Sequence, residues 1–106
     1  MRKEDTLRKM IATVEIITLL KRFKEKAASR YGIRLMGLFG SYARNQQTEN
    51  SDIDVFVALQ EPDFFVLEKI KEELENLTHS SVDVVSFRDS LRPSFKKNIL
   101  KDAILI

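Results

Sequence analysis

The sequence predicts an α+β fold, a small mixed β-sheet flanked by helices, and three observations lead to this prediction. Segments with apolar residues at three- and four-residue steps alternate with short runs of apolar, β-branched residues. Glycine, proline and polar clusters separate these segments, whose order is helix, strand, strand, helix, strand, helix. The 106 residues, of which 43% are hydrophobic and 32% charged, suit one globular domain spanning residues 1–106.

A long amino-terminal helix is predicted over residues 4–30, and Gly32 marks its end. The apolar residues of this segment recur at helical steps, so they form one stripe along the helix. The side chains expected to face inward are Leu7, Met10, Ile11, Val14, Ile17, Leu20 and Phe23. The sheet then lies in the remaining core, about residues 31–106.

Three short runs at 33–39, 53–59 and 81–87 are predicted as strands, because they are rich in apolar and β-branched residues. Between the first two strands, residues 41–47 are interpreted as a short helix. The polar segment 45–51 is interpreted as a loop that leads into the second strand.

Two further helices complete the predicted fold. Asp63 has the side chain of a helix N-cap, and the helix after it is expected to run to about residue 77. Its inward face is expected to consist of Leu67, Ile70, Leu74 and Leu77. Pro93 suits the first turn of a last helix, which is expected to direct Phe95, Ile99 and Leu100 inward. Residues 103–106 form a short strand or a tail.

Composition excludes several classes of protein. The chain has no cysteine, which rules out disulfides and thiolate metal sites, and its single histidine, His79, cannot build a histidine-rich metal site. No apolar stretch approaches the roughly 20 residues of a membrane span, and no signal-peptide pattern opens the chain. We therefore expect a cytoplasmic protein. The net charge is only +2, and the lysine-rich clusters are interpreted as solvated helix faces.

The most informative segment surrounds Asp52 and Asp54, at the start of the second predicted strand. Residues two apart in a strand point to the same face, so these two carboxylates project together. Ile53, Val55 and Val57 then point the other way, into the core. Two neighbouring carboxylates repel each other unless a cation or basic group lies between them. Because magnesium prefers oxygen ligands, the pair predicts a site for one or two Mg²⁺ ions.

Two further features accompany this pair. Gly40 and Ser41 lie where the first strand ends and a short helix begins, so a phosphate can approach the backbone and the serine hydroxyl. Asp83 lies in the apolar third strand, where a carboxylate is costly unless it faces a polar site. Beside the second strand, Asp83 would ligate a metal or accept a proton from an attacking hydroxyl. Singly, each feature is typical of ordinary turns and surfaces; their combination carries the prediction.

Residues 40–44 (GSYAR) and 51–55 (SDIDV) together resemble the motif of the minimal nucleotidyltransferase (MNT) domains of the DNA polymerase beta superfamily. Ten residues separate Ser41 from Asp52, which resembles the spacing in MntA-type antitoxins. The third predicted strand and the carboxyl-terminal stretch also resemble the family, so the resemblance covers roughly residues 30–106. Asn45 departs from the glycine of many relatives, but asparagine tolerates the left-handed backbone conformation.

The resemblance implies a nucleotidyltransferase fold and attack of a hydroxyl on the α-phosphate of a nucleoside triphosphate, with release of pyrophosphate. It implies that Asp52, Asp54 and Asp83 are the catalytic and metal-binding residues. It also implies that Gly40, Ser41 and Arg44 bind the nucleotide. The positioning of the reactants and neutralisation of the phosphate charge would supply the rate enhancement.

The same resemblance implies a HEPN-type toxin as partner, ATP as donor, and transfer of AMP to a tyrosine of the toxin, which makes the chain an antitoxin. An alternative stays open, in which an MNT-fold antitoxin neutralises its partner by binding alone. Nucleic acid is disfavoured as a partner, because the net charge is small and no array of base-stacking aromatic residues is visible. Both homo- and hetero-oligomers stay open.

Overall fold

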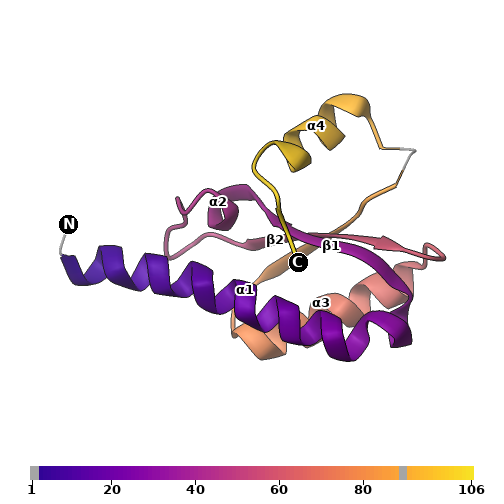
Figure 1. The fold of residues 1–106 in the computed structure, drawn as a ribbon, viewed down its shortest axis with the longest axis horizontal. Helices are drawn as coiled ribbons and strands as arrows, with labels where there is room; N and C mark the ends of the chain where they lie inside the picture. The colour runs from indigo at the N-terminus through magenta and orange to yellow at the C-terminus, as the bar shows by residue number, and fades with distance from the viewer. Residues whose placement is uncertain (1–2, 89–90) are drawn as a thin grey trace.

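The structure, a computed structural model, describes residues 3–88 and 91–106, with side chains described from residue 13 onward in these ranges. The chain there forms the following elements: α1 (Lys3–Tyr31), β1 (Ile33–Phe39), α2 (Gly40–Ala43), β2 (Ile53–Leu59), α3 (Phe64–Thr78), β3 (Val82–Ser86), α4 (Pro93–Lys101) and β4 (Ile104–Leu105). Figure 1 shows their arrangement. The predicted α+β fold class and the order of the main elements are confirmed.

The strands form one mixed sheet in the order β3-β2-β1-β4. Strand β1 runs antiparallel to both β2 and β4, whereas β2 and β3 run parallel. Helix α3 supplies the crossover that parallel strands require. This topology places β2 at the centre, between β1 and β3, so residues of β2 face neighbours on both sides.

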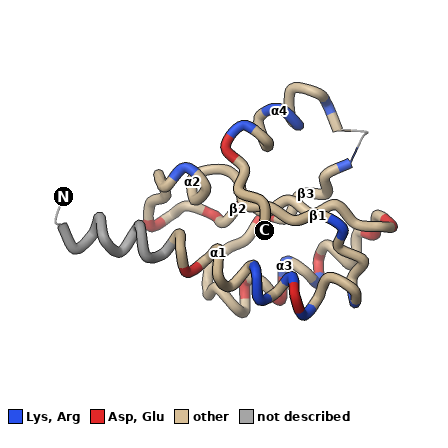
Figure 2. The backbone as a smooth tube through the Cα atoms, viewed as in Figure 1, with Lys and Arg blue, Asp and Glu red and all other residues tan. Residues whose placement is uncertain are grey.

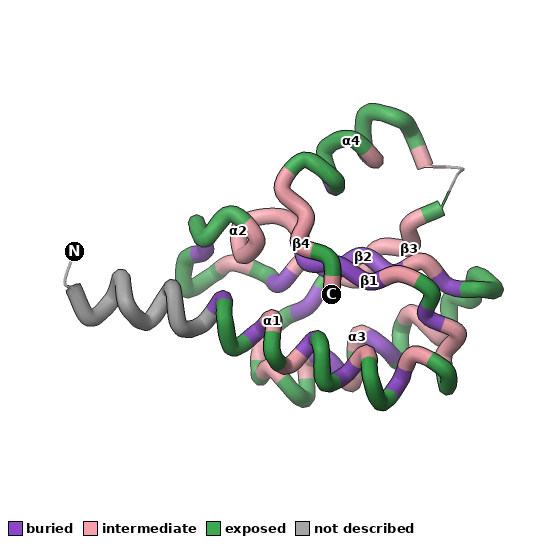
Figure 3. Tube along the Cα trace, in the orientation of Figure 1, coloured by how far each residue is buried: buried purple, intermediate pink, exposed green. Residues whose placement is uncertain are grey.

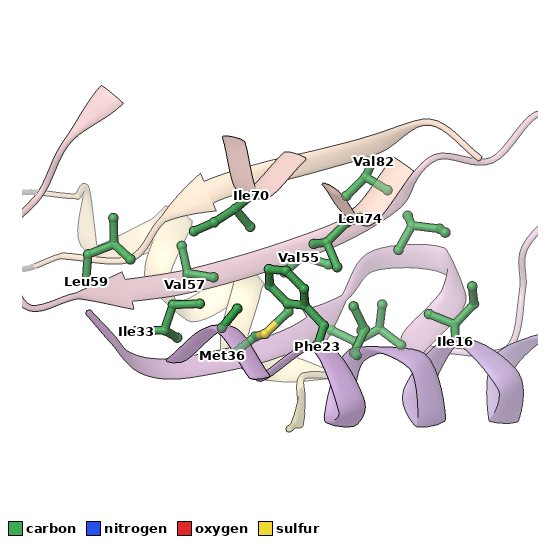
Figure 4. Close-up of a cluster of buried hydrophobic side chains, with 14 residues drawn as sticks. Ile16, Phe23, Ile33, Met36, Val55, Val57, Leu59, Ile70, Leu74 and Val82 are labelled. Atoms are coloured by element: carbon green, nitrogen blue, oxygen red, sulfur yellow. The ribbon is translucent and has the colours of Figure 1, made fainter. Parts of the chain in front are cut away.

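The main core lies between the sheet and the layer formed by α1 and α3 (Figures 1 and 4). Alternate residues of β2, Ile53, Val55 and Val57, have no exposed surface and point into this core, as predicted. Ile70 and Leu74 meet them from α3. Figure 3 shows the buried positions concentrated in the strands and in these two helices. Burial of these apolar side chains is the main favourable contribution to folding here.

The opposite face of the sheet carries a smaller apolar cluster, on the side where α4 lies (Figure 1). Phe56 has no exposed surface, and its ring lies 6.1 Å from that of Phe39 and 5.5 Å from that of Phe87, between ring centroids. Gly37 lies opposite Phe56 in the β1–β2 ladder, and a methyl group at this glycine would overlap the Phe56 ring. Ile99 is the buried residue of α4.

The predicted inward stripe of α1 is wrong at Val14, whose side chain is 64% exposed. The buried positions are Thr13, Ile16, Leu20, Phe23 and Ala27, which recur at steps of three and four. Leu20 and Phe23 are buried as predicted, and Ile17 packs against the core. The stripe departs from the prediction only at its start, because a polar residue, Thr13, occupies an inward position and hydrogen-bonds there. Leu7, Met10 and Ile11 lie outside the described side chains.

Three other predicted details need correction. The short helix expected at 41–47 spans Gly40–Ala43, because Asn45 adopts a left-handed conformation (φ 55°) that ends it. Leu77 is 44% exposed, at the edge of the α3 stripe. Phe95 and Leu100 are 41% and 51% exposed, since α4 buries one narrow face around Ile99. Within the described ranges, no helix is both long and apolar enough to span a membrane.

Candidate active site

Two carboxylates meet where β2 pairs with β3. Asp54 lies directly opposite Asp83 in this parallel ladder, and paired residues of neighbouring strands project to the same face of a sheet. The residues on either side of Asp54, Ile53 and Val55, are fully buried in the main core, so Asp54 projects away from it. Asp54 is half-buried and Asp83 is exposed. The structure thus brings together the two acids that the sequence placed in separate strands.

Asp52 and Arg44 also act on this carboxyl pair. The pKa of Asp54 is raised above its ordinary value, first by burial and then by the negative charges of Asp83 and Asp52. The positive charge of Arg44 opposes this rise. Asp52 is exposed and lies two residues before Asp54, immediately before β2 begins at Ile53. Three acids therefore share one electrostatic environment at the end of the sheet where β2 begins.

Gly40 lies against the carboxylate of Asp54. Its φ of 73° is left-handed, and a methyl group at this position would overlap Oδ2 of Asp54. The preceding residue, Phe39, pairs with Asp54 in the β1–β2 ladder, so the turn into α2 begins beside the acid. Asp54 therefore already fills the place that a side chain at position 40 would need. Glycine lets the carboxylate lie directly against the backbone at the start of α2.

Ser41 lies within α2, and Arg44 follows the last residue of this helix. Ser41 is half-buried, and its backbone carbonyl accepts a hydrogen bond from the Gln46 amide at 2.8 Å. Arg44 caps the carboxyl end of α2; its Nη1 lies 3.7 Å from Oδ2 of Asp102, and its Nε donates to Gln46 Oε1 at 3.3 Å. Figure 2 shows basic residues at this end of α2 and along α4, on the same side of the sheet.

Asp102 is a neighbour of the site that sequence reasoning did not find. It follows α4, and its contact with Arg44 joins residues that are 58 positions apart (from 44 to 102). No local pattern could have indicated it, because the contact depends on how α4 is placed over the sheet.

The donor set fits a magnesium ion. Asp52, Asp54 and Asp83 supply carboxylate oxygens. The pKa of Asp54 is raised first by burial and then by its acidic neighbours, and a divalent cation would offset the negative charge of these neighbours. Among the described residues, no three His, Cys, Asp or Glu side chains are already arranged as a metal centre. Magnesium does not need such a cage, since it commonly uses one or two carboxylates with water and substrate phosphates.

A family model described as polymerase beta nucleotidyltransferase matches residues 20–106. The chain belongs to this family. The match includes all six candidate residues: Gly40, Ser41, Arg44, Asp52, Asp54 and Asp83. This nucleotidyltransferase is therefore a member of an enzyme family, and the sequence-based prediction of the family is confirmed.

Individual relatives agree with this assignment. The nucleotidyltransferase is 33% identical over 98 residues to the protein adenylyltransferase MntA of Thermococcus cleftensis, covering 92% of this chain and 98% of the relative. It also resembles a solved structure provisionally assigned as a minimal nucleotidyltransferase, with a TM-score of 0.68 and 33% identity over 84% of this chain and 93% of the other.

A second solved structure is a toxin–antitoxin with AMP-PNP. The nucleotidyltransferase is similar to it with a TM-score of 0.65 and 26% identity, over 76% of this chain and 66% of that one. About a third of that longer chain therefore lies outside the comparison. The same fold thus occurs in a protein solved together with an ATP analogue.

Proposed function

We propose that this nucleotidyltransferase moves AMP from ATP to a hydroxyl of a protein, in a magnesium-dependent reaction, and that the acceptor is a tyrosine of a HEPN-type toxin. The chain would then act as an antitoxin in the cytoplasm. The observation that carries the proposal is the pairing of Asp54 with Asp83 beside Gly40. Acids that repel one another, packed against a glycine backbone at a strand-to-helix turn, are suited to a cation and a phosphate.

The reaction forms one bond and breaks another at the α-phosphorus. The acceptor oxygen bonds to this phosphorus, the bond to the oxygen that bridges to the β-phosphate breaks, and pyrophosphate leaves. Bound magnesium would offset the negative charge of the triphosphate. Asp52 and Asp54 would hold it. Asp83 would complete this site or accept the proton of the attacking hydroxyl.

The other candidate residues would hold the triphosphate. Gly40 has no side chain, so the phosphates can approach the backbone beside Asp54. The hydroxyl of Ser41 would donate a hydrogen bond to a phosphate oxygen. The guanidinium of Arg44, which already opposes the rise in the pKa of Asp54, would add positive charge on the same side. Fixing the reactants in line accounts for a large part of the expected rate enhancement.

The relatives support the choice of donor and acceptor. A protein 33% identical to this chain is named a protein adenylyltransferase, which supports AMP as the transferred group and a protein as acceptor. A similar structure is that of a toxin–antitoxin with AMP-PNP, which supports ATP as donor and a toxin as partner. The tyrosine and the HEPN class follow from the family resemblance of the motif at residues 40–55.

The proposal is tested by incubating the purified chain with α-labelled ATP, Mg²⁺ and the product of the adjacent gene, which the proposal expects to be a HEPN-type toxin. We expect label on the toxin with the wild-type chain and none with Asp54→Asn or Asp83→Asn. Asp63→Asn is the matched control, because Asp63 caps α3 through the amides of Phe65 and Val66, and asparagine caps helices as well.

One result would decide against the proposal, and a second would show that the comparison of variants is uninformative. If the wild-type chain transfers no label, yet it and both Asn variants bind and silence the toxin equally, the chain is an antitoxin that acts by binding alone. If Asp63→Asn loses transfer as completely as Asp54→Asn, the loss does not report on the acid pair.

A further inference from the structure

The loop between α2 and β2, residues 44–52, connects the two halves of the site. Gly40 and Ser41 lie just before it, and its last residue is Asp52. Most of its side chains are exposed, but Gln47 is only 3% exposed. A glutamine is rarely buried to this extent without hydrogen-bonding partners, because its amide must be desolvated. Gln47 therefore marks the point where the loop is held against the rest of the protein.

The residue that holds it is Thr13 of α1. The Gln47 amide Nε2 donates to Thr13 Oγ1 at 2.9 Å, and the same hydroxyl donates to Asn45 Oδ1 at 3.2 Å. The backbone carbonyl of Tyr42 lies 3.5 Å from this hydroxyl, as a second acceptor. Thr13 is 8% exposed and is the polar member of the inward stripe of α1. One buried hydroxyl thus contacts two side chains of the loop.

Asn45 contributes its backbone as well as its side chain. Its φ of 55° is left-handed, and this conformation turns the chain away from α2. Asparagine adopts it more readily than most residues, and here the amide oxygen gains the hydroxyl of Thr13 as a donor. Glycine would permit the same turn without that bond. The side chain of Asn45 therefore couples the turn to α1.

We propose that Thr13, Asn45 and Gln47, the loop anchor, are positioning residues that set the location of Asp52 relative to Gly40 and Ser41. The inference rests on the proposed function, because it concerns the same site. The first residues of the loop also bond to α2, and Arg44 contacts Asp102. Nearer to Asp52, the loop bonds to itself, in the turn where the Ser51 amide donates to the Thr48 carbonyl at 3.1 Å. Loss of the anchor would let Asp52 move while Gly40 and Ser41 stay in place.

The central variant is Thr13→Val, which keeps the shape of the side chain and removes the hydroxyl. We expect kcat for AMP transfer to fall about 10- to 100-fold, because a displacement of about 1 Å has effects of this size. The Kd for the analogue AMP-PNP should change less than about threefold, since the predicted phosphate contacts remain. Thr13→Ser keeps the hydroxyl and should restore kcat to near the wild-type value.

The matched control is Thr18→Val, on the same helix. Thr18 is exposed, and its hydroxyl donates to the Val14 carbonyl at 3.0 Å within α1. We expect this variant to keep the wild-type kcat. Asn45→Gly is the second test variant, because it changes an exposed residue and keeps the left-handed turn. It should lower kcat about 3- to 10-fold even if Thr13→Val folds poorly.

Amide hydrogen exchange tests the loop anchor independently of the proposed function. Exchange at residues 45–52 should be at least about 10-fold faster in Thr13→Val than in Thr18→Val, with little change in β1 and β2. Equal exchange in the two variants would overturn the anchor, as would a wild-type kcat in both Thr13→Val and Asn45→Gly. If the wild-type chain transfers no nucleotide, the proposed function fails, and the exchange comparison still decides whether the anchor exists.

Discussion

The two faces of β2 differ in polarity, in burial and in charge. One face carries Ile53, Val55 and Val57, which are fully buried against α1 and α3. The other carries Asp54, which is half-buried and paired with Asp83, and whose pKa is raised by burial and then by the neighbouring acids. The apolar face contributes to stability through burial, whereas charges are crowded on the acidic face at a cost to the folded protein. Neighbouring residues of a single strand thus have different roles: the buried apolar ones stabilise the fold, and the acidic one belongs to the candidate site.

The largest expected effect separates the two faces directly. Asp54→Asn should lower the rate of AMP transfer by about 10³-fold or more, because it removes a predicted metal ligand from the site. The neighbouring Val55→Ala should leave the transfer rate of the folded fraction within about threefold of wild type, since its side chain points into the main core. Steady-state kinetics on both variants, corrected for the folded fraction, check this contrast.

The second prediction concerns the glycine beside the acids. Gly40→Ala should lower transfer by about 100-fold, because the added methyl group overlaps Oδ2 of Asp54. Gly32→Ala is the matched control: its φ is also left-handed, at 67°, but the added methyl group would lie 3.5 Å from Gln60 Cβ, an ordinary contact. Both variants should lose about 1 kcal/mol of stability from backbone strain, and only the first should lose activity. Equal activity in the two would show that the close approach of Asp54 to Gly40 is not needed for transfer.

The third prediction concerns the contribution of the apolar face of β2 to the free energy of unfolding. Val55→Ala should lower the free energy of unfolding by about 2–3 kcal/mol, from lost burial and the cavity left behind. Val14→Ala, at an exposed position of α1, should change it by less than about 0.5 kcal/mol. Urea unfolding monitored by circular dichroism measures both. A large loss at Val14 would mean that α1 packs through the stripe predicted from the sequence.

The fourth prediction concerns the stability cost of the acidic face. Folding raises the pKa of Asp54, so around this pKa the folded protein binds more protons than the unfolded chain. Ionisation of Asp54 therefore opposes folding as the pH rises above the ordinary pKa of an aspartate. Asp54→Asn should therefore raise Tm slightly at pH 7 without metal. Mg²⁺ should raise the Tm of the wild type and have a smaller effect on Asp54→Asn. Thermal unfolding in EDTA and in Mg²⁺ measures the direction of both Tm changes. A lower Tm for Asp54→Asn than for the wild type without metal would contradict a destabilising effect of the Asp54 charge in the folded protein.

The smallest effect is expected at the contact between Arg44 and Asp102. Their atoms lie 3.7 Å apart and both side chains are partly exposed, so Asp102→Asn should change stability by less than about 0.5 kcal/mol. Arg44 should then be freer to contact the triphosphate, and KM for ATP should stay within about twofold of wild type. Kinetics at varied ATP concentration check this, and a large rise in KM would show that Asp102 holds Arg44 in its productive position.

The apolar half of the molecule was largely predictable from the sequence. Strands β1 and β2 have the predicted bounds, and Asp63 caps α3 as expected. These features follow from local rules, the period of apolar residues and the preferences of cap residues. The prediction failed where a tertiary contact overrides the local pattern. Thr13 is turned inward by its bonds to the loop at residues 44–52, so Val14 is turned outward.

The acidic site was predictable in part. The two-residue period of a strand places Asp52 and Asp54 on one face, but it says nothing about which strand lies beside them. Asp83 lies beside Asp54 because of the strand order β3-β2-β1-β4 and because of the register that pairs these two residues. The contacts of Arg44 with Asp102 and of Thr13 with Gln47 join distant segments. Such contacts are set by packing, and no spacing within the sequence indicates them.

The most direct test of the acidic site is the location of a bound divalent ion. Mn²⁺ can replace Mg²⁺ in a complex with AMP-PNP, and its paramagnetism broadens the NMR signals of nearby amides. The proposed site requires the strongest broadening at Gly40, Ser41, Asp52, Asp54 and Asp83, with none of this pattern in Asp54→Asn. Broadening centred instead on Glu61 and Asp63, at the other end of β2, would contradict a metal site formed by the paired acids.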